Sequence, residues 1–425
     1  MKKTAILSLS LAVCLPLFSQ TIDECQRAAE QNYPLIRQYD LIGKTADVSV
    51  ENLQKGWLPQ ITASAQATYQ SDVASWPDEM AGMLSQMGLD MKGLRRDQYR
   101  VGIDIAQTVY DGGAIRSQKE IARQQAAVSA AQNDVSLYTL RKRVNEMYFS
   151  LLLIDNRIAL SRDMQALLLT NEKKLASMYK RGTASESDYN TVRAERISTS
   201  QRLTDLTAQR STLARLLAAF CGMDSVSVTM PADETTLQSG TRPELRLIDE
   251  RIRLTEARQH MLSSQLMPRL SVFASGFYGY PGYNMFEDMM SHRWSLNGMV
   301  GVRMTWNIGA LYTHKGDKAR LSIERDALDV ERSTFLFNNR LERLQQQDNI
   351  SRYDTLLADD EEIISLREKV RKAAESKLAH GIIDVGDLVR EINNENAARM
   401  QLMAHKIEKM KQVYDMKITD GVTGR

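Results

Sequence analysis

Apolar side chains along this chain follow two periods, and the places where the period changes divide the sequence into segments. In four long tracts they recur every three or four positions, as at Leu151, Ile154 and Ile158, which is the spacing of an amphipathic helix. The tracts lack glycine and proline and cover residues 115–181, 183–221, 317–380 and 387–420. Because a helix of about 65 residues is close to 100 Å long, we expect the helices to pack as in coiled coils.

Four shorter segments alternate with a period of two, which predicts β-strands with one apolar and one polar face. They are residues 61–70, 99–109, 270–280 and 294–308. The polar face carries Arg100 and Asp104 in the second segment and Arg303 in the fourth. Strands of roughly ten residues with one apolar face, flanked by Trp and Tyr, are typical of membrane barrels. We therefore expect Arg100, Asp104 and Arg303 to face a water-filled lumen.

Both kinds of segment occur twice in the same order, which indicates an internal duplication. Residues 56–69 align with 264–278 at an offset of 209, which places Pro59 on Pro268. The segments that begin at residues 101 and 181 align with those that begin at 300 and 380, at an offset of 199. The ten-residue difference falls in the loop between strands, where insertions are tolerated. Each half is therefore predicted to contain a lead helix, two strands and a helical hairpin.

The number of strands bears on the oligomeric state. Four strands are too few to close a bilayer-spanning barrel, since the smallest barrels have about eight. An open sheet edge in lipid leaves backbone groups unsatisfied, at several kcal/mol each. The chain must therefore oligomerise, with either two or three copies supplying the strands. The predicted fold class is an α+β membrane protein with long helical hairpins and four β-strands per chain.

The N-terminus has the pattern of an export signal. Lys2 and Lys3 precede an apolar stretch over residues 5–17, and Ser19 is a small residue suited to cleavage. That stretch is too short for a membrane-spanning helix, which needs about 20 apolar residues. We expect a signal peptide over 1–19, followed by one domain made of two structural repeats, residues 20–222 and 242–420.

The chain has three cysteines. Lipid attachment at Cys14 is disfavoured because Val13 stands where a small residue is needed. Cys25 and Cys221 remain after cleavage. In an exported protein they could form a disulfide or stay as two buried thiols, and the sequence favours neither.

Charge and motif content give no sign of catalysis. With 55 basic and 53 acidic residues, the chain has no excess charge for nucleic acid. The histidines lack ligand spacing, no glycine-rich phosphate loop occurs, and we expect neither a cofactor nor a metal. Four methionines between the first two strands could bind Cu(I), but a short amphipathic helix is the favoured interpretation. They are Met80, Met83, Met87 and Met91.

Several landmarks resemble the TolC-like outer-membrane factors, also called outer membrane efflux proteins. They are TIDECQRAAEQNYPLI at the start, GWLPQI before the first strand, VYDGGAIRSQKEIARQQ after the second, RPELRLIDERIRL opening the second half, and WNIG after the last strand. Each is weak alone, but their order and spacing cover the whole mature chain.

The resemblance implies a homotrimer whose strands form a twelve-stranded β-barrel in outer-membrane lipid, above a barrel of helices in the periplasm. It implies a passive exit duct, not an enzyme, in a tripartite efflux or type I secretion system. The partners would be a periplasmic adaptor (membrane fusion) protein and an inner-membrane pump of the RND or ABC type.

The resemblance also implies roles for the two helical turns, as periplasmic tips where adaptors dock and the pore narrows. The docking candidates are Arg181, Gly182, Ser187, Asp188, His380 and Gly381, and the constriction candidates are Asp387, Arg390 and Glu391. This chain departs from some relatives, which carry an acid at the position of Arg390 and a basic residue at that of Ile383. An alternative interpretation is that Asp188 and Asp387 only cap or solvate helix starts.

An alternative function is a structural or adhesive coiled-coil protein of the periplasm or cell surface. Long helices would serve it equally well. It gives no reason for four amphipathic strands in two matched pairs, so the channel is the favoured hypothesis.

Overall fold

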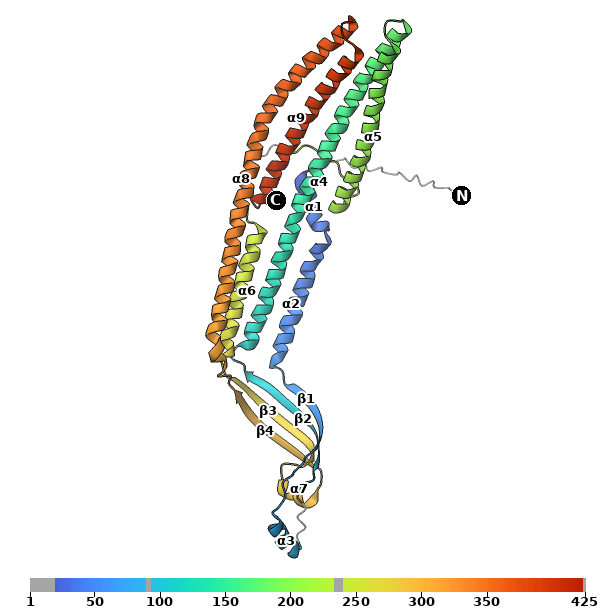
Figure 1. Ribbon diagram of the computed structural model, residues 1–425. Helices are drawn as coiled ribbons and strands as arrows, with labels where there is room; N and C mark the ends of the chain where they lie inside the picture. The colour runs from blue at the N-terminus through green and yellow to red at the C-terminus, as the bar shows by residue number, and fades with distance from the viewer. Residues whose placement is uncertain (1–19, 89–92, 233–239, 423–425) are drawn as a thin grey trace, which may run out of the picture. The chain divides into compact units, whose positions relative to one another are not determined.

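A computed structural model describes residues 20–88, 93–232 and 240–422 (Figure 1). The predicted signal segment 1–19 and Met91 lie outside the described residues. The elements are α1 (Ile22–Asn32), α2 (Gln38–Gln54), β1 (Gln60–Tyr69), α3 (Asp78–Gln86), β2 (Asp97–Tyr110), α4 (Ala114–Lys180), α5 (Glu186–Cys221), α6 (Pro243–Gln265), β3 (Arg269–Tyr280), α7 (Met285–Ser291), β4 (Ser295–Thr305), α8 (Ala310–Ala379) and α9 (Val385–Thr419), with short 3-10 turns η1 (Pro34–Arg37) and η2 (Lys55–Trp57).

The chain divides into two compact units, which are described separately. The helical unit contains residues up to 39, 131–247 and 332 onwards. The sheet unit contains residues 40–130 and 248–331. The predicted division into two sequence repeats cuts the chain differently and stays a prediction.

Two antiparallel helical hairpins dominate the helical unit, α4 with α5 and α8 with α9 (Figure 1). All four predicted helices are present. The predicted start of the third was wrong, because α8 begins at Ala310 and runs through Gly316. One glycine costs a helix only about 1 kcal/mol, which a helix of 70 residues tolerates.

The core of the helical unit joins helices from both ends of the sequence. Tyr148 and Phe149 on α4 are buried against Ile22 on α1, Leu217 on α5 and Ile407 on α9. Each such side chain contributes about 1.5–3 kcal/mol through burial. A second cluster, nearer the hairpin turns, buries Leu168 and Leu175 on α4, Val192 on α5, and Leu388 and Ile392 on α9. The hairpins are therefore packed against each other along much of their length.

The sheet unit contains one antiparallel sheet in the order β1-β2-β3-β4. The predicted strands are confirmed, although the fourth ends at Thr305, earlier than expected, because residues 307–310 turn into α8 through a hydrogen bond from Ala310 N to Asn307 O. The two β-hairpins have equivalent registers. The sequence offsets of 209 and 199 carry the pair Tyr69–Asp97 onto Tyr278–Leu296.

A short α-helix, α3, follows β1, where the methionine spacing predicts one. Met80, Met83 and Met87 are exposed on it and at its C-terminal end. Within the described residues, no cluster of His, Cys, Asp or Glu has the composition of a metal site.

Candidate functional site: an amphipathic sheet and two hairpin turns

One face of the sheet is apolar and uncovered by the rest of the described chain. Leu296 and Val300 on β4 are 83% and 77% exposed. Their neighbours on this face are Ile61, Tyr69, Val101, Ile103, Val272, Tyr278, Val302 and Met304, which are also exposed. A soluble monomer rarely exposes so continuous an apolar surface.

Aromatic side chains lie at both ends of this face. At the end near α7, Trp294 stacks on Tyr99 with ring centroids 5.9 Å apart and contacts Tyr278 at 5.4 Å. At the opposite end Tyr110 and Trp306 are exposed just before α4 and α8. Aromatic girdles flanking an apolar band are the pattern of strands that cross a bilayer.

The opposite face carries the predicted lumen residues. Strand register puts Arg100, Asp104 and Arg303 on the same face, because Asp104 pairs with Ser275 and Ser275 with Met299, four residues before Arg303. This shared polar face was expected from the alternation of the sequence.

Two arginines on this face, Arg100 and Arg303, lie against phenylalanine rings of β3. The guanidinium carbon of Arg100 is 3.9 Å from the centroid of Phe277, and Arg100 also donates to Ser275 Oγ at 3.4 Å. Arg303 lies 4.6 Å from the centroid of Phe273. These cation–π contacts hold the positive charges close to the sheet.

The sheet has two open edges within the described chain. β1 pairs with β2, and β4 with β3, so the outer edge of each terminal strand has no strand partner among the described residues. Such edges pair with another chain unless they are protected.

The two helical turns have the same backbone geometry. Gly182 and Gly381 have positive φ values of 75° and 71°. Gly182 N donates to Tyr179 O and the next residue donates to Met178 O, both at 2.9 Å. The turn at Gly381 repeats both hydrogen bonds with Leu378 O and Lys377 O. This is the Schellman motif, in which a left-handed residue ends the helix, so the turn requires glycine.

The predicted acids after the two turns differ in their contacts. Asp188 completes a capping box: its Oδ2 accepts from Ser185 N at 3.0 Å and from Ser185 Oγ at 2.6 Å. In the second hairpin Asp384 caps the helix and accepts from Asp387 N at 2.8 Å. The geometry of Asp188 therefore agrees with the capping interpretation, whereas the carboxylate of Asp387 is left for another contact.

The predicted constriction residues engage in ion pairs. Asp387 Oδ1 lies 3.2 Å from Arg390 Nη1, and the Arg390 side chain is exposed while that of Asp387 is partly exposed. Glu391 lies 3.6 Å from Arg367 on α8. The structure thus brings Asp387 and Arg390 together, and Arg390 offsets the charge of the proposed acidic position.

The remaining tip residues fold back on their own helices. Arg181 donates to Ser177 Oγ at 2.9 Å, and His380 Nδ1 is 2.8 Å from Ser376 O. Ser187 lies in the first turn of α5, with its carbonyl accepting from Thr191 Oγ1. These contacts fix the start and end of each turn.

A pair of ion pairs in the hairpins was missed by sequence reasoning. On α4 and α5, Glu172 Oε2 is 2.5 Å from Arg196 Nε. On α8 and α9, Arg371 Nε is 2.5 Å from Glu395 Oε2. The offset of 199 places Glu172 on Arg371 and Arg196 on Glu395, so the two hairpins carry the same ion pair with its charges exchanged. The offset found in the strands and turns could have located these positions.

Another interhelical pair is repeated without exchange. Asp155 on α4 pairs with Arg210 on α5, and at the same offset Asp354 on α8 lies 2.6 Å from Lys409 on α9. The two hairpins are therefore related position by position along their length.

Comparison with known proteins finds a related family over part of the chain. Among the described residues, every helix is too short or too polar to cross a membrane. Residues 26–223 match a family model described as outer membrane efflux protein. Over this part, just under half of the chain, it is similar to the outer membrane efflux proteins. The likeness is to channel proteins of the outer membrane and not to enzymes.

Solved channel structures share the fold of this chain over both of its halves. The outer-membrane channel OprN is 15% identical with a TM-score of 0.67, covering 94% of this chain and 89% of that one. VceC from Vibrio cholerae is 12% identical with a TM-score of 0.66, covering 94% and 96%. The open state of MtrE from Neisseria gonorrhoeae is 14% identical with a TM-score of 0.64, covering 95% and 89%. A search of curated proteins found no match.

Proposed function

We propose that this chain forms a homotrimeric exit duct in which three sheets close a twelve-stranded barrel. β4 of one copy would pair with β1 of the next, which would satisfy both open edges. The apolar faces would contact lipid, and the face with Arg100, Asp104 and Arg303 would line a water-filled lumen. The observation that carries the proposal is the open four-stranded sheet with one exposed apolar face and one face bearing Arg100, Asp104 and Arg303.

The proposed duct works as a passive conduit of a tripartite efflux or type I secretion system. A periplasmic adaptor would dock at the turns that contain Gly182 and Gly381, and an inner-membrane pump of the RND or ABC type would drive the cargo. The support is the pair of matched Schellman turns beside exposed charged residues. The duplication into repeats 20–222 and 242–420 is part of this proposal, and equivalent strand registers and ion pairs support it.

Measurement of the oligomeric mass tests whether the chain forms a trimeric duct. The protein is extracted with detergent from separated outer membranes, and its mass is measured by light scattering with the detergent contribution subtracted. We expect three copies per particle, found only after detergent extraction. A monomer or dimer released without detergent would overturn the proposal and favour a structural coiled-coil protein.

Substitution of the charged residues at the second turn tests whether the pore narrows there. Because Asp387 pairs with Arg390 in the same chain, a ring of Asp387 carboxylates would select cations only weakly. We expect Asp387→Asn to lower the cation preference of single channels in planar bilayers and Arg390→Gln to raise it. Equal ion selectivity in both variants and the unmodified channel would rule out a constriction at this position.

A further inference from the structure

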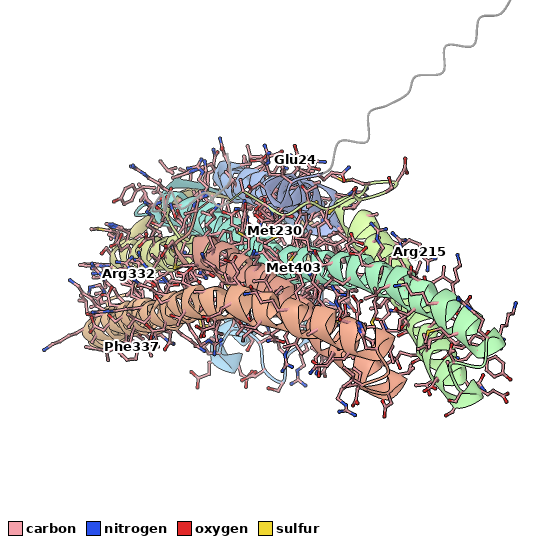
Figure 2. All side chains as sticks on the ribbon, turned by 90° about the horizontal axis from the view of Figure 1, so that it is seen from above. Glu24, Arg215, Met230, Arg332, Phe337 and Met403 are labelled. Carbon is pink, nitrogen blue, oxygen red and sulfur yellow. The ribbon has the colours of Figure 1, made fainter. Side chains whose placement is uncertain are left out.

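The two cysteines of the mature chain lie in the core of the helical unit. Cys25 on α1 and Cys221 at the end of α5 are 0% and 4% exposed. Both belong to the cluster that also buries Tyr148 and Leu217. Glu24, next to Cys25, and Arg215, on the helix that ends at Cys221, are labelled in Figure 2.

The two thiols are in contact, although they are unlinked in this structure. Cys221 Sγ lies 3.4 Å from the carbonyl oxygen of Cys25. A hydrogen bond between the two side chains raises the pKa of Cys25 and lowers that of Cys221. The two helices therefore meet at these two cysteines.

We propose that Cys25 and Cys221 are joined by a disulfide in the exported channel. The pairing is unambiguous, because the only other cysteine, Cys14, lies in the predicted signal peptide. The compartment outside the inner membrane is oxidising, and disulfides persist there. This inference rests on the outer-membrane location and not on the proposed trimer.

The reaction needs an oxidant, which we take to be a periplasmic protein disulfide of the thiol-oxidase class. One cysteine thiolate attacks that disulfide and forms a mixed disulfide, and the second thiolate then displaces the oxidant. The channel loses two electrons and two protons, and the oxidant leaves as a dithiol. Because both sulfur atoms are buried in the folded core, the exchange takes place before α1 closes over α5.

The disulfide would fasten the start of the mature chain to the first hairpin. The same junction is held by polar contacts: Gln20 N donates to Ser227 O at 2.9 Å, and Asn32 Nδ2 donates to Ala219 O at 3.3 Å. The two cysteines are 196 residues apart. In the chain-entropy model, crosslinks across long separations restrict the unfolded chain most.

Thiol labelling of the unmodified full chain tests the proposal. Cells are lysed with N-ethylmaleimide present, so that oxidation cannot occur after lysis. The channel is then unfolded in excess reagent without reductant and its intact mass is measured. We expect no label, and a peptide pair linked through Cys25 and Cys221 after digestion. Two labels and no linked peptides would overturn the proposal.

Two controls confirm the labelling. Reduction before labelling must give two labels per chain. The Cys221→Ser variant must give one label, on Cys25, under non-reducing conditions. If that variant is not recovered, Cys25→Ser replaces it, and the result on the unmodified chain decides the question in either case.

Discussion

Gly182 and Gly381 show how single residues set the ends of the helical hairpins. Both adopt the left-handed conformation, and apart from the adjoining residues no atom lies within 4 Å of where a Cβ would stand. Backbone conformation, not crowding, therefore requires glycine at these positions. A side chain there would cost about 1–2 kcal/mol through its contact with the following carbonyl.

We expect Gly182→Ala to lower the free energy of unfolding by about 1 kcal/mol. Gly182→Asn should cost less than the alanine variant, because asparagine tolerates the left-handed region. Denaturant unfolding in detergent, followed by circular dichroism, measures both. Equal losses in the two variants would mean that the conformation at Gly182 is not what limits stability.

The candidate site was predictable in part at the residue scale. The sequence indicates both turn glycines. For the acids after them it leaves two interpretations, a constriction of the pore or a helix cap. The structure resolves the contact of Asp188, which completes a cap with Ser185. A capping box depends on the backbone geometry three residues away, which the residue pattern alone does not determine. Capping therefore remained one of two interpretations of Asp188.

At the scale of elements, the sequence predicted the four long helices and four strands because their periods are long and consistent. The ends of elements were less predictable. Gly316 does not end α8, since a single breaker has a small cost beside many helical hydrogen bonds. Interhelical ion pairs were also missed, because they require the rotational setting of two helices.

The exchanged ion pairs favour the correct pairing of helices over incorrect pairings. Glu172 on α4 and Glu395 on α9 would repel each other if α4 paired with α9, and Arg196 would repel Arg371 if α5 paired with α8. Like charges in partly buried positions disfavour wrong pairings. The exchange therefore favours pairing within each hairpin.

A charge exchange in the first hairpin tests this pair. We expect Glu172→Arg to destabilise the channel, since it places two arginines together at a site where Arg196 and Glu172 are only 28% and 12% exposed. Adding Arg196→Glu should recover most of the loss, because the second hairpin already accommodates that arrangement. Denaturant unfolding of the singles and the double gives a coupling energy of about 2 kcal/mol.

An exposed ion pair on a single helix is the matched control. Asp40 and Lys44 on α2 lie 2.5 Å apart and are 66% and 69% exposed. Exchanging their charges should change stability by less than about 0.5 kcal/mol. A coupling at Glu172 and Arg196 no larger than in this control would remove the argument for pairing specificity.

At the scale of the whole molecule, the sheet unit explains why this chain belongs in a membrane. Its apolar face is continuous over four strands and flanked by Trp and Tyr, and the register puts Arg100, Asp104 and Arg303 on the other face. The alternating sequence predicted this amphipathic sheet. The proposed closure into a barrel would need other copies of the chain, so it cannot be seen in the sequence pattern or in one chain.

Two neighbouring residues on β4 distinguish a lipid face from a lumen face. Val300 points to the apolar side and Met299 to the side of Arg303. In a bilayer, Val300→Lys should cost about 2–4 kcal/mol and reduce the amount of assembled channel in the outer membrane. Met299→Lys should assemble normally, because its charge would face water.

The measurement is the amount of heat-resistant oligomer in purified outer membranes, quantified on gels for the two variants at equal expression. Equal assembly of Val300→Lys and the unmodified channel would mean that this apolar face does not contact lipid. Loss of assembly in Met299→Lys alone would reverse the assignment of the faces. Because the two residues are adjacent on one strand, a general disruption of β4 would affect both variants alike, so only a difference between them reports on the lipid.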